Sequence, residues 1–300
     1  MRSAARSGTD GQAAGVLLVL SSTVAFAVGP TAARVAFDNG ANTLTVVALR
    51  GVVAAALMAL LVLAARQGFA IGRAAWRWCL WCGAFQAAAV YCFIGSIASI
   101  PVGLAVLVFF THPLLVAAAA HWGGGERLTG RKLLLALAVL AGLAAALGPG
   151  LGALDPCGVA LAALASVAVS GMILCTGPAQ ERATSAQVNL CATAAGGVGF
   201  AVLATALGGW ALPSNAAGWL GILGAGVGIG AGLLAFFAAI RRLGTARATM
   251  LGSVEPLVSI AFAAAVLGER LGPGQWAGAA LVVVALALFE TADRGSRTGG

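Results

Sequence analysis

Glu255, His112 and Arg50 are ionisable residues that lie inside long apolar stretches of this sequence. Glu255 and His112 each stand directly before a proline, Pro256 and Pro113, and the two prolines are 143 residues apart. A carboxylate, an imidazole and a guanidinium can all bind charged groups of a solute, and the first two can also carry a proton. The repeated placement of an ionisable residue before a proline predicts a shared site or a shared mechanical role.

The composition places these residues in a membrane protein. Of the 300 residues, 61% are hydrophobic and 9% are charged, and the mean hydropathy is +1.00. A soluble domain carries about 25% charged residues, so this chain has too little polar surface to fold in water. The net charge of +8 comes from residues scattered between apolar runs, without a basic face, which argues against a nucleic-acid partner. We expect one polytopic domain whose partner is the lipid bilayer.

Ten apolar stretches are long enough to cross a bilayer, which takes about 20 residues in a helix. Alternating polarity, which barrel strands need, is absent from them. The sequence therefore predicts an all-α membrane protein with ten transmembrane helices. These are 13–35, 43–65, 75–97, 102–122, 132–147, 157–175, 186–207, 217–240, 245–267 and 275–291.

The basic residues predict the orientation of these spans. With the N-terminus in the cytoplasm, fourteen arginines and lysines fall on the cytoplasmic side and two, Arg34 and Arg270, fall outside. Such an excess on the inner side is typical of multi-pass proteins. We expect a bacterial inner-membrane protein with both termini in the cytoplasm.

The 143-residue offset extends beyond the prolines and predicts two structural repeats. Gly15 matches Gly158, Gly83 matches Gly226, and Glu126 matches Glu269 in the Gly-Glu-Arg-Leu sequence that closes each proline span. Each repeat holds five spans, an odd number, so the second enters the membrane from the opposite side. We expect inverted five-helix repeats at residues 13–149 and 156–292.

Each ionisable residue in the spans has a functional and a structural interpretation. A charge at the bilayer centre costs about 2.5–3.5 kcal/mol, so such residues usually act on substrates, ions or protons. Burial favours the neutral form of Glu255, which suits proton coupling, although Glu255 and His112 could instead lock the two halves together. Arg50 could bind a substrate carboxylate, reach the interface or pair with an acidic side chain.

Pro113 and Pro256 each remove a helix hydrogen bond and free the carbonyl four residues back. The resulting kink could offer that carbonyl to a ligand, act as a hinge, or only serve packing. Gly224, Gly228 and Gly232 form a small-residue stripe for close helix contact.

Smaller polar residues in the spans have weaker functional signals. We expect hydrogen bonds between helices from Asn189, Gln86 and Tyr91. If these side chains line a cavity, they would shape its selectivity. The pair Cys79 and Cys82 has metal-like spacing without a second pair, so we expect small buried cysteines, no metal and no cofactor. The sequence contains no recognisable catalytic set, which argues against an enzyme.

These features resemble the EamA family of the drug/metabolite transporter superfamily. The resemblance rests on His112-Pro113 with Gly125-Glu126, on Glu255-Pro256 with Gly268-Glu269, and on Arg50 in the second span, and it covers nearly the whole chain. It implies an alternating-access transporter that exports small organic solutes such as amino acids or metabolites. The residues expected to bind the substrate are Glu255, His112, Arg50, Tyr91 and Asn189.

Two rival functions stay open at this point. An uncoupled facilitator would use Glu255 for binding only, whereas a scaffold or sensor subunit that transports nothing would use the polar residues structurally. The sequence is also compatible with a homodimer.

Overall fold

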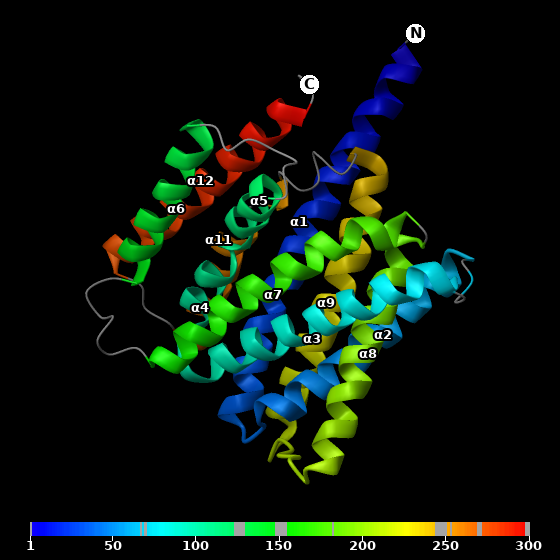
Figure 1. The fold of residues 1–300 in the computed structure, drawn as a ribbon, viewed down its shortest axis with the longest axis vertical. Coiled ribbons are helices and arrows are strands. Elements are labelled where there is room, and N and C mark those ends of the chain that lie inside the picture. The colour runs from blue at the N-terminus through cyan, green and yellow to red at the C-terminus, as the bar shows by residue number, and fades with distance from the viewer. Residues whose placement is uncertain are drawn as a thin grey trace.

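The computed structural model describes residues 2–66, 68, 71–122, 130–147, 155–181, 183–243, 251–252, 254–268 and 272–297. All regular structure in these residues is helical (Figure 1). Both predicted closures at Glu126 and Glu269 lie outside the described residues. The helices are α1 (Arg2–Asp38), α2 (Thr43–Ala64), α3 (Arg73–Ser99), α4 (Val102–Phe109), α5 (His112–Trp122), α6 (Gly130–Leu147), α7 (Pro156–Gln180), α8 (Ser185–Ala206), α9 (Ala216–Leu243), α11 (Glu255–Leu267) and α12 (Pro273–Arg297).

Six helices of the described part, α1, α2, α3, α7, α8 and α9, are long and apolar enough to cross a membrane. Shorter apolar helices cover Val102–Val116, Glu255–Leu267 and Pro273–Leu288. The chain is therefore an all-helical membrane protein, while the count of ten spans stays a prediction.

The fourth predicted span is broken at its proline. We expected a kinked helix over 102–122, but α4 ends at Phe109 and α5 begins at His112. A proline ring disfavours helical backbone in the residue before it and supplies no N–H, so it suits the first turn of a new helix better than an interior. Pro256 likewise lies in the first turn of α11, after a turn at Val254.

Helices of the two halves pack in matched pairs. The offset of 143 residues makes α7, α8, α9 and α12 the counterparts of α1, α2, α3 and α6. The largest interfaces are α1 with α9 and α3 with α7, which are equivalent under this exchange, followed by α6 with α12 and α2 with α8, which pair each helix with its own counterpart. The contacts therefore follow a two-fold relation between the halves.

Gly15 and Gly158, matched in sequence, have the same structural role. A Cβ atom on Gly15 would lie 2.6 Å from Leu243 Cγ, and one on Gly158 would lie 2.8 Å from Ile100 Cγ2. Leu243 and Ile100 are themselves 143 residues apart. Each glycine thus admits an apolar side chain of the opposite half at the equivalent place.

The counterparts α2 and α8 run antiparallel. Gln187, in the first turn of α8, donates from Nε2 to the carbonyl of Gly68, just beyond the end of α2, at 2.6 Å. At the other end, Asn42 caps α2 and donates to the carbonyl of Gly209, just beyond α8, at 2.7 Å. A helix antiparallel to its own counterpart means that one half is turned over relative to the other.

The glycines of α9 face two different helices. A Cβ on Gly228 would lie 2.6 Å from the Ala25 carbonyl of α1, and Gly224 and Gly232 also face α1. These three glycines form the stripe that the sequence predicted for close helix contact. Gly226 and Gly230 instead face Val53 and Leu57 of α2. Small residues at these positions let three backbones approach closely.

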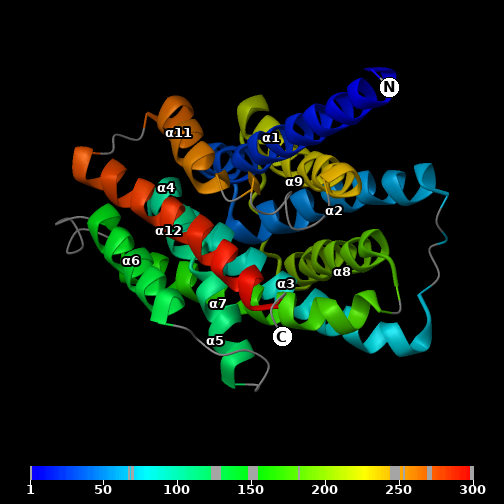
Figure 2. The same ribbon diagram turned by 90° about the horizontal axis from the view of Figure 1, so that it is seen from above.

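Helices α6 and α12 lie side by side at one edge of the molecule (Figures 1 and 2). Their inner faces pack on α4 and α11 through Val139, Val282 and Ile260. Leu133, Leu134 and Leu137 of α6 are exposed. Exposed apolar side chains on a helix of a membrane protein are suited to contact with lipid or with a partner.

Candidate functional site

A cavity of about 460 Å³ lies between the two halves. Its walls come from α1, α2, α3, α4 and α5 of the first half and from α7, α8, α9, α11 and α12 of the second. The polar lining consists of Ser22, Thr23, Arg50, Gln86, His112, Asn189, Glu255 and Ser259.

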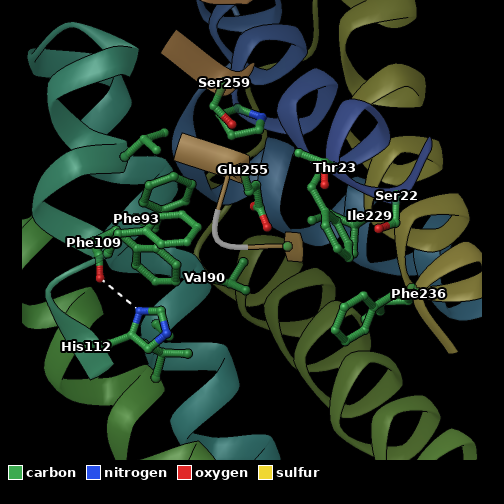
Figure 3. Close-up of a pocket in the computed structure, with 18 of the residues that line it drawn as sticks. Ser22, Thr23, Val90, Phe93, Phe109, His112, Ile229, Phe236, Glu255 and Ser259 are labelled. Carbon is green, nitrogen blue, oxygen red and sulfur yellow. Dashed lines mark hydrogen bonds between the residues drawn. The ribbon is translucent and has the colours of Figure 1, made fainter. Parts of the chain in front are cut away.

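Glu255 enters this cavity from the first turn of α11 (Figure 3). The helix break positions it, because a residue at the start of a helix points away from the body of that helix. Ser259 lies one turn further along α11 and also lines the cavity. Sequence reasoning missed Ser259, although its spacing of four from Glu255 could have revealed the shared face.

His112 lies at the start of α5 and is fixed by the carbonyl that the helix break leaves free. Its Nδ1 atom is 3.1 Å from the oxygen of Phe109, the atom that the missing N–H of Pro113 would have bonded (Figure 3). A carbonyl only accepts, so this contact assigns the ring proton to Nδ1. The carbonyl of His112 accepts from Ser170 Oγ on α7 at 3.3 Å. The freed carbonyl thus orients the histidine.

Arg50 is buried on α2, with 6% of its surface exposed, and lines the same cavity. Its neighbour Gly51 packs directly on Gly197 of α8, where a Cβ would lie 2.7 Å from the Gly197 Cα. Among the described residues the one ion pair is Arg34–Asp38, at 3.1 Å, so neither Arg50 nor Glu255 is neutralised by a described side chain. A guanidinium from one half and a carboxyl group from the other therefore face one cavity.

Of the two remaining predicted site residues, Asn189 and Tyr91, one lines the cavity and the other does not. Asn189 of α8 lines the cavity. Tyr91 does not: it is 40% exposed and stacks on Phe200, with 5.5 Å between ring centroids. The fold thus brings Glu255, His112, Arg50 and Asn189 together and leaves Tyr91 outside.

The two predicted hinge residues mark where helices begin rather than where one helix bends. Pro256 is buried in the first turn of α11, and Pro113 is the second residue of α5. A third proline, Pro30, lies inside α1 and lines the cavity, although no pattern in the sequence pointed to it.

Aromatic rings form much of the apolar wall. Phe26, Phe93, Phe109, Phe110 and Phe236 line the cavity from both halves. Phe109 lies against both Phe93 and His112, with centroid distances of 4.8 and 5.4 Å. The wall was not predicted, because phenylalanine in an apolar span carries no signal of its orientation.

Two of the cysteines are buried as small side chains away from this cavity. Cys79 and Cys82 are buried in a cluster between α3, α7 and α8. None of the six cysteines forms a disulfide bond. No group of three or more potential ligands in the described residues could hold a metal ion.

Antiparallel helical repeats around a largely apolar cavity that holds a few ionisable side chains define a multi-pass membrane protein. Comparison with known proteins gives the family. The model of the EamA-like transporter family matches residues 13–148 and again 156–291. The chain belongs to the EamA-like transporter family, whose members are transporters rather than enzymes.

Two further comparisons, with curated proteins and with solved structures, give information about the fold but not about the substrate. No curated protein matches the chain. One solved crystal structure has a TM-score of 0.64 at 20% identity, over 96% of this chain and 99% of that one. At this identity the likeness concerns the fold and not the substrate.

Proposed function

We propose that the protein is an alternating-access carrier that exports small organic solutes across a bacterial inner membrane. The observation that carries this proposal is the cavity between the two halves, which receives Arg50 from one half and Glu255 from the other. We propose ten spans arranged as inverted five-helix repeats, with both termini in the cytoplasm. This arrangement would place the cavity near the middle of the membrane. Rocking of one half against the other would then expose it to each side in turn.

The cavity chemistry favours a solute with both charges and an apolar body. The planar guanidinium of Arg50 suits a carboxylate, and Glu255 suits an ammonium group. A volume of about 460 Å³ lies within the usual range for small-molecule sites. Aromatic walls would cover an apolar side chain. Amino acids and similar metabolites fit this description.

Glu255 is also our candidate for proton exchange. A buried carboxylate is costly when ionised and unpaired, so it is stable either with a proton or with a cationic ligand. Exchange of one for the other would couple solute export to proton entry. His112 has a more local role in this proposal, since its Nδ1 is held by Phe109.

Flux in proteoliposomes tests the proposal. We would load L-phenylalanine, L-threonine, phenethylamine and 3-phenylpropionate separately, and follow efflux with and without a pH gradient. We expect the zwitterions to move faster than the two single-charge analogues, and the gradient to accelerate them. If no member of this panel or of a wider amino-acid and metabolite panel moves, the carrier function is wrong, and a scaffold or sensor role takes its place.

Glu255→Gln tests the coupling. The amide keeps the size of the side chain but cannot exchange a proton, so we expect flux that no longer responds to the pH gradient. Glu181→Gln is the matched control, because Glu181 is exposed and lies outside the cavity. If wild-type flux ignores the gradient, the protein is an uncoupled facilitator. If Glu255→Gln retains both flux and its pH response, the assigned role of Glu255 is wrong.

A further inference from the structure

Gln86, at the middle of α3, has one half of its amide bonded and the other half buried without a partner. Its Nε2 donates to Thr193 Oγ1 of α8 at 3.0 Å. Its Oε1 is buried and has no hydrogen-bond partner among the described residues. A buried carbonyl oxygen without a donor destabilises the fold, so its surroundings should offer a donor.

A second, small cavity of about 30 Å³ also reaches this side chain, and Gln86 and Arg50 line both it and the large cavity. Gln86, Thr193 and Arg50 all line the small cavity, so α2, α3 and α8 meet there. A water molecule needs a space of about 10–15 Å³ on this measure, together with two to four polar partners. The small cavity meets both requirements.

Arg50 supplies the donors. Its guanidinium carries five N–H groups and no acceptor. It lines both cavities, and no described side chain forms an ion pair with it. The presence of this donor-only group also favours the amide orientation that turns Oε1, rather than Nε2, toward the small cavity.

We propose that the small cavity binds one water molecule that links the Arg50 guanidinium to Gln86 Oε1, and that Gln86 is therefore a positioning residue for Arg50. The chain of bonds runs from Arg50 through the water and Gln86 to Thr193. It connects α2 and α3 of the first half to α8 of the second.

The neutrality of Gln86 matters as much as its geometry. A carboxylate at this position would cancel the charge of Arg50, whereas an amide and a water orient the guanidinium and leave its charge available. On the proposed function, that charge is what attracts the carboxylate of the solute. The link between Arg50 and Gln86 itself is independent of any transport activity.

Thermal unfolding of the purified full chain tests the link through a double-mutant cycle. Gln86→Leu should lower the unfolding midpoint by about 3–6 °C when Arg50 is present, because the guanidinium loses its acceptor. In an Arg50→Met background the same change should be neutral or stabilising, since it then removes a carbonyl that has no donor. Equal shifts in both backgrounds would overturn the proposal.

Variants of Thr193 distinguish loss of the proposed hydrogen bonds from a general loss of packing. Thr193→Ser keeps the hydroxyl that holds the Gln86 amide and should unfold close to wild type, whereas Thr193→Val should lower the midpoint and lose part of the coupling to Arg50. In an experimental density map at high resolution, we expect a peak within hydrogen-bond distance of Gln86 Oε1 and Arg50. A clear map without that peak contradicts the proposal.

Transport measurements distinguish a role of Gln86 in positioning Arg50 from a role in packing alone. Gln86→Glu should raise the KM for L-phenylalanine about 10-fold and leave the KM for phenethylamine nearly unchanged, because only the anionic group is affected. An equal change for both probes would overturn the positioning role. If neither probe is transported by the wild type, the proposed function fails, while the unfolding cycle still decides whether Gln86 and Arg50 are linked.

Discussion

Arg50 and Glu255 combine two properties that rarely occur together in a membrane span: each is ionisable, and neither has a described side chain as an ion-pair partner. Ionisable groups inside a membrane usually act on substrates, ions or protons, and that is the role that we propose for both residues. His112 differs, because the carbonyl freed at the helix break already occupies one of its nitrogens. The break therefore has a chemical consequence as well as a geometric one.

Replacing Arg50 should weaken the binding of anionic groups. On the proposed function, Arg50→Gln would remove a charge-assisted contact worth about 1.5–3 kcal/mol, so we expect the KM for L-phenylalanine to rise about 10-fold or more. Arg34→Gln is the control, since Arg34 lies outside the cavity and pairs with Asp38. Similar kinetics for Arg50→Gln and wild type in the same proteoliposome assay would remove Arg50 from the site.

At the scale of helices, glycine decides how closely the halves approach. Gly51 and Gly197 bring α2 and α8 into backbone contact next to Arg50, and the glycines of α9 do the same for α1 and α2. The paired roles of Gly15 and Gly158 show that this arrangement belongs to the repeat and not to one helix. A larger residue at such a crossing must move a backbone, which the packed interior resists.

The crossing of α2 and α8 can be tested with two glycines of one helix. A Cβ on Gly197 would lie 2.7 Å from the Gly51 carbonyl carbon, whereas a Cβ on Gly199 would meet nothing within 4 Å. We expect Gly197→Ala to destabilise the protein by about 1–3 kcal/mol, and Gly199→Ala to be neutral or stabilising by up to about 1 kcal/mol. Thermal unfolding of both variants checks this, and equal midpoints would show that the crossing tolerates a side chain.

At the scale of the whole molecule, the packing of counterpart helices turns one half over relative to the other. Two repeats related in this way are typical of transporters, and their two-fold axis lies in the plane of the membrane. The cavity lies where the halves meet, so one half contributes Arg50, the other contributes Glu255, and both contribute part of the aromatic wall. The chemistry differs between the halves although the backbone plan repeats, with His112 in one and Glu255 in the other.

The orientation in the membrane can be measured with a native cysteine. Cys157, in the first turn of α7, is the exposed cysteine, while the other five are buried or partly buried. The proposed topology places Cys157 on the outer side, so a membrane-impermeant maleimide should label intact spheroplasts, and Cys157→Ser should abolish that labelling. Labelling confined to inside-out vesicles would reverse the topology.

The sequence determined the class and the repeat because charge, hydrophobicity and the x-Pro pairs are properties of the chain itself. It also pointed to Glu255, His112 and Arg50, since an ionisable group in an apolar span stands out from its neighbours. Ser259, Pro30 and the phenylalanine wall did not stand out, because such residues are ordinary in membrane helices.

Only the tertiary structure decided which side chains meet. Tyr91 and Asn189 looked alike in sequence, yet the packing of α3 turns Tyr91 onto Phe200, while α8 turns Asn189 into the cavity. A helix made almost entirely of apolar residues has no polar face to fix its rotation in advance. Rotation is set by the glycines that admit a neighbouring helix, and it decides whether a residue before a proline, such as Glu255, faces lipid, protein or a solute.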